Sequence, residues 1–595
     1  MNMKPRWKCT LIFLLTLIPI NENIADTKNI PRATNPCSPR EQWTLPNSLP
    51  ANSAEIFLSS LRGSIKSVRS FAEALTIRRK ASSPQSLKLF AEYWISRSLY
   101  EAGLIHAAHA GFSATLAKKA KSTTSGIRLA ALGCLIAIHD RYTSIQLDPG
   151  MSSVLHELSK NAVLQDEFRS IHDAALLLLF DSLGGDKPNQ NIIGLLRGSG
   201  AHWSLAKGVL AATENKHDIT ISELSRFITS ETRSSRLHRY DNQARLLMAR
   251  AYYSNMMFDK ASAALKEISK QSNELVTALS ELAWAQLSAN QLHEAIGTTL
   301  SLFSGGLRRT FTPESPMILA MAFNELCRYP EAINASNLFR AQYAATRQWL
   351  VSFAKKPYRL YGSATAALVA TIQDEPRAPD HVISEWLRSP VFISHQEEIN
   401  LTFSESKSAE GFAISGQAEQ HDISTQAVAL IDRLTPQVST QSLSSDTDAT
   451  KMLIRLRNLL LSFHKMQAAA PIWKILHGNQ SNHMAARKTN LLANIERDLH
   501  ERTLRMLWQL DEVAENIRLL EVEVYGGATK DIIKQHIDKA AKIKKENPIT
   551  KTTGPKTWDW GTTRLIANSG SETEVWEDEL GSFKADLTDK CGGQP

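Results

Sequence analysis

Two segments place a serine three residues before a lysine with apolar residues between the two, the spacing at which a lysine amine can activate a serine hydroxyl as a nucleophile. They are Ser204–Lys207 and Ser352–Lys355, and the same spacing also occurs at 404–407 and 462–465. Such a short pattern arises by chance roughly a few times in a long chain, and its usual companion Lys-Thr-Gly is only approximated at 551–554. His156-Glu157 lacks the second histidine of a helical zinc site. We therefore expect no enzyme activity, no cofactor and no small-molecule substrate.

The cysteines limit which disulfide bonds can join distant parts of the chain. If Cys9 is removed with a leader, then Cys37, Cys134, Cys327 and Cys591 remain, with no zinc-type spacing. Cys37 and Cys591 lie beside turn-forming residues, whereas the other two lie in apolar helical patterns, where a lone cysteine usually behaves as a core residue. We predict a Cys37–Cys591 disulfide that brings the tail onto the N-terminal arm. The alternative is two free or intermolecular thiols.

Residues 1–25 have the composition of a cleavable export signal. Basic residues (Lys4, Arg6 and Lys8) precede the short apolar run 10–20, and Ala25 is a small residue suited to a cleavage site. The run is too short for a bilayer, which needs about 20 helical residues. No cysteine directly follows it, so we do not expect a lipoprotein. The sequence predicts a periplasmic protein, and the alternative is an uncleaved N-terminal anchor.

Length and charge restrict the class of protein. The 595 residues are too many for one ordinary core, and the hydrophobic content of 43% with 22% charged residues is typical of folded domains. A nucleic-acid binder concentrates basic residues on one face, whereas here both signs are mixed and the net charge is only +8. We expect no nucleic-acid partner.

An internal repeat runs through the middle of the chain. Alanines recur 34 residues apart, from 251 to 285 and from 261 to 295, and a third copy follows 37 residues further on, at 322 and 332. Antiparallel helices pack closely where small side chains face each other, and bulky neighbours such as Tyr253 and Leu292 fill the space between pairs. The spacing predicts three stacked helix pairs over 240–340. A generic helical bundle is the alternative.

This pattern resembles the tetratricopeptide repeat family, although Met256 and Cys327 replace the glycine usual at the turn between the paired helices. The earlier segment 98–108 fits the same template and keeps its glycine. We expect an all-α protein with a tetratricopeptide-like α-solenoid over 56–345, after an N-terminal arm at 26–55. The resemblance implies peptide binding along the concave face, and the positions that would line this groove are Arg245, Tyr252, Asn255, Gln286 and Asn290.

The rest of the chain differs from the repeats. Residues 346–450 are polar and Ser-rich, which predicts short helices and linkers. Over 451–533 we predict two coiled-coil helices that fold back as a hairpin through a loop near 478–481, ending at Gly526-Gly527. Apolar residues form a seam at alternating spacings of three and four: Leu492, Ile495, Leu499, Met506, Leu510, Val513, Ile517, Leu520 and Val524. The alternative is self-association of two copies through this seam.

The tail at 534–595 is first basic and then acidic, and it is expected to be irregular. Its aromatic residues stand out in polar surroundings: Trp558, Trp560, Trp576 and Phe583. Because a tryptophan offers a large apolar area, we expect these side chains to be covered. They dock either on this protein's own helices or on a partner as a linear motif.

Several segments resemble a periplasmic repeat protein of bacterial adventurous gliding-motility machinery. They are Glu281–Ala285, Leu326–Tyr329, Glu515–Glu523 and the Trp-rich tail. The resemblance implies a non-enzymatic interaction scaffold whose partners are inner- or outer-membrane proteins of the envelope. The alternative function is a periplasmic chaperone or cell-wall-associated adaptor that binds peptides in the same groove.

Overall fold

The structure is a computed structural model, and it describes most of the chain from residue 49 to 591. The described residues are 37, 49–63, 66–118, 125–142, 145, 154, 175–177, 180–181, 190–231, 233, 235–368, 378–438, 447–543, 565–567, 583–587 and 589–591. Their regular structure is helical except for one short two-stranded ribbon, which confirms the expected all-α class. The predicted signal at 1–25 lies outside the described residues, as does most of the predicted arm.

The first part is an array of helices in which neighbours along the chain pack against each other. The array comprises α2 (Ala51–Leu61), α3 (Ser67–Arg79), α4 (Gln85–Glu101), α5 (Ile105–Ala117), α6 (Ser125–Arg141), α9 (Gln190–Leu196), α10 (Ala201–Thr213), α11 (His217–Thr229), η3 (Ser235–Tyr240), α12 (Asp241–Ser254), α13 (Phe258–Lys266), α14 (Leu275–Ser288), α15 (Leu292–Leu302), η4 (Gly305–Arg309), α16 (Ser315–Glu325) and α17 (Tyr329–Lys355).

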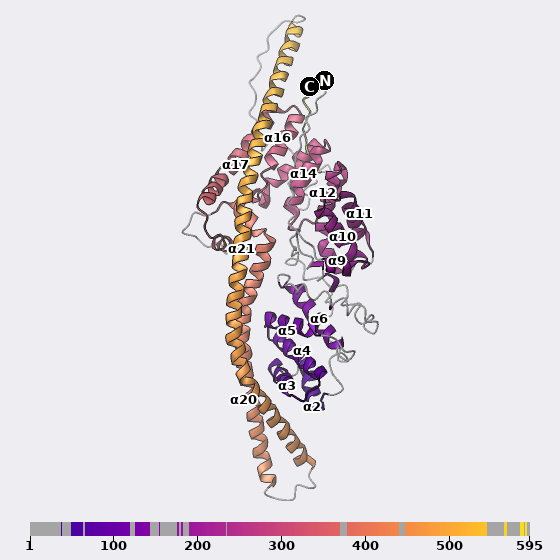
Figure 1. Ribbon diagram of the computed structural model, residues 1–595. Helices are drawn as coiled ribbons and strands as arrows, with labels where there is room; N and C mark the ends of the chain where they lie inside the picture. The colour runs from indigo at the N-terminus through magenta and orange to yellow at the C-terminus, as the bar shows by residue number, and fades with distance from the viewer. Residues whose placement is uncertain are drawn as a thin grey trace.

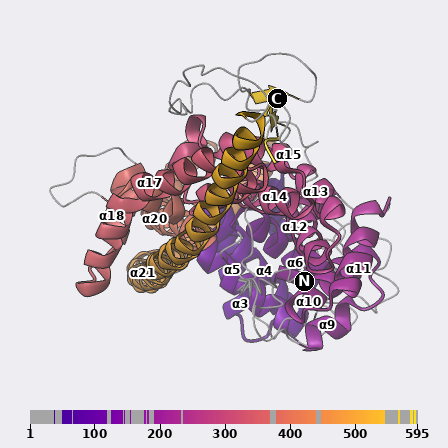
Figure 2. The same cartoon turned by 90° about the horizontal axis from the view of Figure 1, so that it is seen from above.

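The second part is a long antiparallel hairpin. Two short helices, α18 (Tyr361–Leu368) and α19 (Asp380–Leu387), lead into α20 (Pro390–Val438) and α21 (Thr447–Ile543). With its 97 residues, α21 is about 145 Å long at 1.5 Å per residue. Figure 1 shows it running the length of the molecule beside the array. Seen from above in Figure 2, α17 and α18 lie on one side of it and α12 to α15 on the other.

Five turns inside the array share one geometry. Each has a residue of positive φ: Gly103 (81°), Asn215 (56°), Met256 (60°), Asn290 (61°) and Cys327 (53°). In each turn the following backbone N–H donates to the carbonyl five residues before it, for example Met257 N to Tyr252 O at 2.9 Å. This bond is the helix-ending Schellman arrangement. The same reversal therefore joins α4 to α5, α10 to α11, α12 to α13, α14 to α15 and α16 to α17.

Met256 occupies its turn at a cost, because a side chain destabilises a left-handed backbone by about 1–2 kcal/mol. Its side chain is 79% exposed, so little packing is lost when it is removed. We expect Met256→Gly to raise the free energy of unfolding of this region by about 1 kcal/mol, measured by native-state hydrogen exchange of α12 and α13. Met256→Ala keeps the Cβ and should give no such gain. An equal gain from both variants would contradict the argument.

The helix pairs predicted over 240–340 are present as α12/α13, α14/α15 and α16/α17. The six repeating alanines are all 3% exposed or less, which confirms their predicted burial. Around them lie larger side chains, including the edge-to-face pair of Tyr253 and Phe258 at 5.2 Å. The array therefore forms a layered core whose repeat follows the alanine spacing.

The predicted linkers at 346–450 are largely wrong. Residues 390–438 form one continuous helix, which includes the Ser-rich stretch at 404–416. The polar residues there lie mostly on outward faces, while a sparse seam of Leu401, Ala409 and Phe412 is buried inside the molecule. A seam diluted by Ser, Glu and Gly has weak periodicity, which is why sequence analysis missed this helix. The predicted linker at 439–446 lies outside the described residues.

The predicted hairpin is also corrected. The two helices expected at 451–463 and 492–524 are parts of the single helix α21, which passes through the predicted loop at 478–481 and through Gly526-Gly527. The helix that packs against α21 to form the hairpin is α20. Gly527 is where α21 passes Tyr329, since a Cβ there would lie 2.5 Å from the tyrosine ring. This glycine permits a close approach and does not end the helix.

Candidate functional site

The heptad-like seam of α21 is occupied by the protein itself. Its residues lie in one buried cluster with α16, α17 and α19, and Ile495, Leu510 and Val524 have no exposed area. We call this contact the upper clamp. Because the seam is covered by the array, the alternative of self-association through these residues has no free surface there.

Polar contacts fix the upper clamp. The indole Nε1 of Trp386 donates to Thr503 Oγ1 at 2.9 Å, and both residues are buried. Thr503 is a polar residue between Leu499 and Met506 of the apolar seam, and this bond explains its place there. Glu496 of α21 accepts from the backbone N–H groups of Leu360 and Tyr361 at 2.9 and 3.0 Å. A carboxylate there stabilises the start of α18 and ties it to α21.

A second contact, the lower clamp, joins α5 to the hairpin around His106. Its Nε2 lies 2.9 Å from Glu398 Oε1 and its Nδ1 lies 3.1 Å from Glu405 Oε2. Both glutamates belong to α20 and have no exposed area. Arg487 of α21 adds a 2.7 Å ion pair to Glu398. Three helices are therefore joined through one buried, charged cluster.

The charged groups in the lower clamp shift one another's pKa values. Burial by itself lowers the pKa of His106, but its hydrogen bonds to Glu398 and Glu405 outweigh burial and raise that pKa to about 9. Burial raises the pKa of Glu398, and the hydrogen bonds from His106 and Arg487 lower it to about 2. His109 is one turn away on α5, and burial together with the charge of His106 lowers its pKa to about 4. The cluster therefore holds one imidazolium between carboxylates over a wide pH range.

The lower clamp continues toward α3. Lys465 of α21 lies 2.6 Å from Glu73 of α3, whose other oxygen accepts from Ser53 at 2.6 Å. Next to it the rings of Phe71 and Phe412 meet edge-to-face at 5.4 Å. The hairpin is thus bound to both ends of the array, and these clamps set the relative position of all exposed surfaces.

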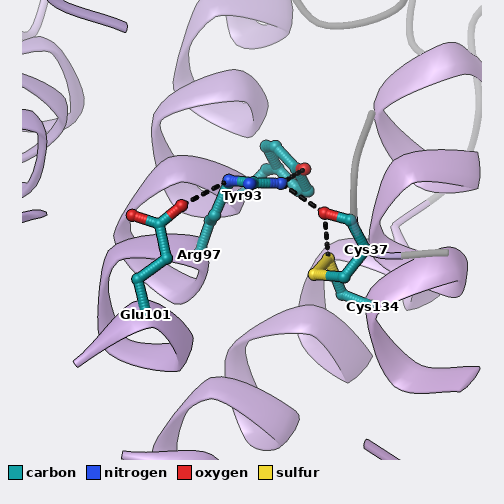
Figure 3. The surroundings of a disulfide bond; sticks show 5 residues. All are labelled: Cys37, Tyr93, Arg97, Glu101 and Cys134. Atoms are coloured by element: carbon teal, nitrogen blue, oxygen red, sulfur yellow. Dashed lines mark hydrogen bonds and ion pairs between the residues drawn. A yellow bond between two sulfur atoms is a disulfide. The ribbon is translucent and has the colours of Figure 1, made fainter. Parts of the chain in front are cut away.

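The disulfide predicted between Cys37 and Cys591 is wrong. Cys37 is joined to Cys134 of α6, with Cα atoms 4.0 Å apart. Figure 3 shows that the carbonyl of Cys37 also accepts from the Arg97 guanidinium, which pairs with Glu101 at 2.9 Å. Cys134 does lie in an apolar helix as expected. The error was to treat a buried position as unable to receive a second cysteine from a separate segment.

The other bridge fastens the end of the tail to the array. Cys591 is joined to Cys327, with Cα atoms 5.0 Å apart. Cys327 is the left-handed residue of the α16–α17 turn and not a core residue, which explains why it is available for pairing. The predicted return of the tail to the N-terminal arm is therefore also wrong.

The described part of the tail packs on the array. Strands β1 (Leu565–Ala567) and β2 (Phe583–Ala585) form an antiparallel ribbon, and β2 lies against α15. His293 Nδ1 is 3.0 Å from the carbonyl oxygen of Ala585, and Lys590 N donates to Leu326 O at 3.1 Å. Trp558, Trp560 and Trp576 lie outside the described residues, as does the side chain of Phe583. Whether those side chains bind a partner stays a prediction.

Peptide mapping tests both bridges. Under non-reducing conditions we expect one peptide that links Cys37 to Cys134 and another that links Cys327 to Cys591, because each pair lies within bonding distance in the fold. Reduction should release four separate peptides, which serves as the control. Recovery of a Cys37–Cys591 peptide would restore the sequence-based pairing and contradict the fold.

One of the five residues predicted to line the groove is buried. Gln286 is 1% exposed and cannot line a surface, because its position on α14 faces the core. Asn290 is exposed at a left-handed turn, and Asn255 donates to Asp218 of α11 at 2.9 Å. Tyr252 packs partly into the core beneath Lys260. Arg245 lies beside Asp241 at 4.0 Å. Arg245, Tyr252 and Asn255 therefore make contacts inside the array, and peptide binding along this face stays a prediction.

The serine–lysine pairs have structural partners. Ser204 is buried in α10, and Lys207 makes a 2.6 Å ion pair with Glu223 of α11. Ser352 Oγ donates to its own helix at Gln348 O. Across the described ranges no group of three or more His, Cys, Asp or Glu side chains is placed to hold a metal ion. Nor, among those same residues, is any helix long and apolar enough to cross a bilayer.

Exposed apolar side chains concentrate on the hairpin. Among the large hydrophobic residues that the structure describes as exposed, all but four lie on α20 or α21. One group, the tip patch, surrounds the turn end of the hairpin and comprises Val428, Ile431, Leu453, Ile454, Leu460 and Leu461. A second group, the outer stripe, lies along α21 opposite the seam and comprises Leu504, Trp508, Leu519, Val522, Ile533 and Ile537. The remaining exposed apolar residues of the hairpin belong to neither group: Phe403, Ile414, Ile475, Tyr525 and Ile532.

Sequence analysis missed the outer stripe, although its residues carry a signal. Their spacings of 4, 11, 3, 11 and 4 residues return to one face of an α-helix, opposite the covered seam. Two apolar stripes on one helix indicate two surfaces to cover, of which the array covers only one. The exposed apolar surface of the hairpin is therefore a candidate interaction surface.

Comparison of the chain with protein-family models, with curated proteins and with solved structures returned no match.

Proposed function

We propose that this protein is a non-enzymatic scaffold for protein–protein interactions. The observation that carries the proposal is the double clamp, which holds a helix of 97 residues rigidly along an array of helix pairs. A clamped rod keeps surfaces at its two ends a fixed distance apart, on the order of 100 Å. Such a spacing suits a component that connects other proteins, and the exposed apolar groups of the hairpin supply attachment surfaces.

We further propose that the array belongs to the tetratricopeptide class. Five turns with one geometry, the 34-residue alanine spacing and the stacked pairs support this assignment. The array would then serve mainly as the frame for the hairpin. The end of its own tail already packs on α15 and on the α16–α17 turn.

The proposed location is the periplasm. Two disulfides support an oxidising compartment, because such bonds are rare where thiols are kept reduced. Together with the resemblance to periplasmic gliding-motility proteins, this supports a role in an envelope-spanning complex, where the rod would connect inner- and outer-membrane components. A periplasmic chaperone or cell-wall-associated adaptor is the alternative.

Affinity purification from cross-linked envelopes tests the scaffold. We expect the tagged full-length protein to recover a small, fixed set of envelope proteins. Ile454→Glu combined with Leu461→Glu places charge in the tip patch and should reduce that recovery at least fivefold. Arg455→Glu is the matched control, since it changes the net charge of the same turn equally without touching the tip patch.

The outcome separates the two functions. Recovery of many unrelated unfolded proteins would favour the chaperone. Equal recovery by the tip-patch variant and by Arg455→Glu would exclude the tip patch as an attachment surface. Failure to recover any envelope protein from cross-linked envelopes would overturn the scaffold proposal.

A further inference from the structure

The outer stripe has an internal symmetry that points to a specific partner. Leu504 and Ile537, Trp508 and Ile533, and Leu519 and Val522 are three pairs centred on one point, between Leu520 and Glu521. An antiparallel copy of α21, placed with a two-fold axis at that point, therefore brings each member of a pair opposite its mate. The stripe is self-complementary in the sense that a two-fold interface requires.

The charges beside the stripe follow the same symmetry. In this register Arg518 of one copy lies opposite Glu523 of the other, and Asp511 lies opposite Lys530. Asp511 also pairs with Arg347 of its own chain, and Arg518 with Glu515, both at 2.7 Å. A parallel arrangement would instead place Glu515 opposite Glu515. Opposite charges across the interface and like charges in the alternative together select the antiparallel orientation.

The size of the stripe is sufficient for a specific contact. Its residues extend over about 50 Å of helix, and the six side chains are 40–69% exposed. Burying them in both copies would cover on the order of 1,000 Å², the lower end of specific interfaces. None of these six side chains is needed to hold the fold, since the clamps use the opposite face of α21.

We propose that the outer stripe binds a second copy of this chain, with the two α21 helices antiparallel. This inference stands apart from the scaffold proposal, because it concerns a different face and needs no envelope partner. The dimer would extend the rod from about 145 Å to about 220 Å around a two-fold axis and place one array on either side of that axis.

Sedimentation velocity of the full-length protein tests the dimer. We expect a monomer–dimer equilibrium with a dissociation constant in the micromolar range. Val522→Glu should weaken it at least tenfold, because it puts a charge opposite Leu519 of the other copy. Gln535→Glu adds the same charge on the other side of α21 and should leave the equilibrium unchanged. A monomer at 100 µM, or equal effects of the two substitutions, would overturn the proposal.

Two further measurements test the orientation. Arg518→Glu should weaken the dimer through Glu–Glu repulsion, and the added change Glu523→Arg should restore it. Mixing Leu519→Cys protein with Val522→Cys protein should give a disulfide-linked dimer that neither forms alone to the same extent. Same-site cross-links of equal yield would indicate a parallel pair and refute the register.

Discussion

Substituting His106 by alanine is expected to destabilise the junction of α5 and α20 by about 3–5 kcal/mol. The reason is that Glu398 and Glu405 are both inaccessible to solvent, and His106 is a charge partner of both. Without it, both buried carboxylates lose the imidazolium, although Glu398 keeps its ion pair with Arg487 and Glu405 keeps the backbone N–H of residue 106. Because a chain of this size does not unfold in one step, the measurement is native-state hydrogen exchange of α5 and α20.

The control is an ion pair on the same hairpin. Lys451 and Asp448 are 3.4 Å apart, but their side chains are 77% and 76% exposed. Lys451→Ala should change stability by less than about 1 kcal/mol, since solvent screens such pairs. A His106→Ala effect as small as that of Lys451→Ala would show that the lower clamp is held by packing and not by charge.

The same cluster predicts a dependence on pH. The pKa of His106 is about 9 in the fold against 6.5 for a free histidine. Its contribution is therefore complete below pH 6.5 and is lost as the pH rises through 9. The pKa of Glu398 is about 2 in the fold, so its contribution is complete above pH 4.5 and is lost only as the pH falls through 2. The clamp is strongest between these limits, from pH 4.5 to 6.5.

Hydrogen exchange at two pH values measures this effect. Between pH 6.5 and 9 the wild type should lose about 3 kcal/mol at the α5–α20 junction, relative to a His106→Gln variant that lacks the titrating group. Each measured exchange rate is divided by the intrinsic amide exchange rate at that pH, so that the comparison reports only the opening equilibrium. Parallel pH profiles for the two proteins would mean that His106 is not charged between the glutamates.

The array could be predicted from sequence because its rules are local. A small residue at a fixed interval, such as Ala285 after Ala251, specifies close helix contacts wherever the pair stands in the fold. The turn was predictable too, since Met256 and Cys327 take the left-handed position that the template assigns to glycine. In both cases the information lies within about one repeat of the chain.

The hairpin could not be predicted in the same way, because its contacts join distant segments. The seam from Leu492 to Val524 shows that α21 has an apolar face, but no residue in it indicates whether a second helix, a second copy or the array covers that face. His106 and Glu398 are 292 positions apart, and neither is unusual in its local sequence. The predicted disulfide was wrong for a related reason, because the burial of Cys134 excludes solvent but does not exclude a second cysteine.

Substitution of two glycines of α20 by alanine is expected to change stability in opposite directions, although their local sequence does not distinguish them. A Cβ at Gly416 would lie 2.6 Å from the ring of Trp473, whose side chain is 2% exposed. A Cβ at Gly411 would meet nothing within 4 Å. Five residues apart in one helix, they share the backbone conformation but differ in space. Gly416 lets α20 approach α21 at the tryptophan.

We expect Gly416→Ala to destabilise the packing of α20 on α21 by about 1–3 kcal/mol, because the buried indole has little room to move. Gly411→Ala should instead stabilise α20 by about 0.5–1 kcal/mol, the ordinary gain from replacing a helical glycine. Hydrogen exchange of α20 measures both. Trp473→Leu should destabilise the packing of α20 on α21 less in the Gly416→Ala background than in the wild type. The reason is that the smaller side chain makes room for the new methyl group. Stabilisation by Gly416→Ala equal to that of Gly411→Ala would show that the indole does not contact this glycine.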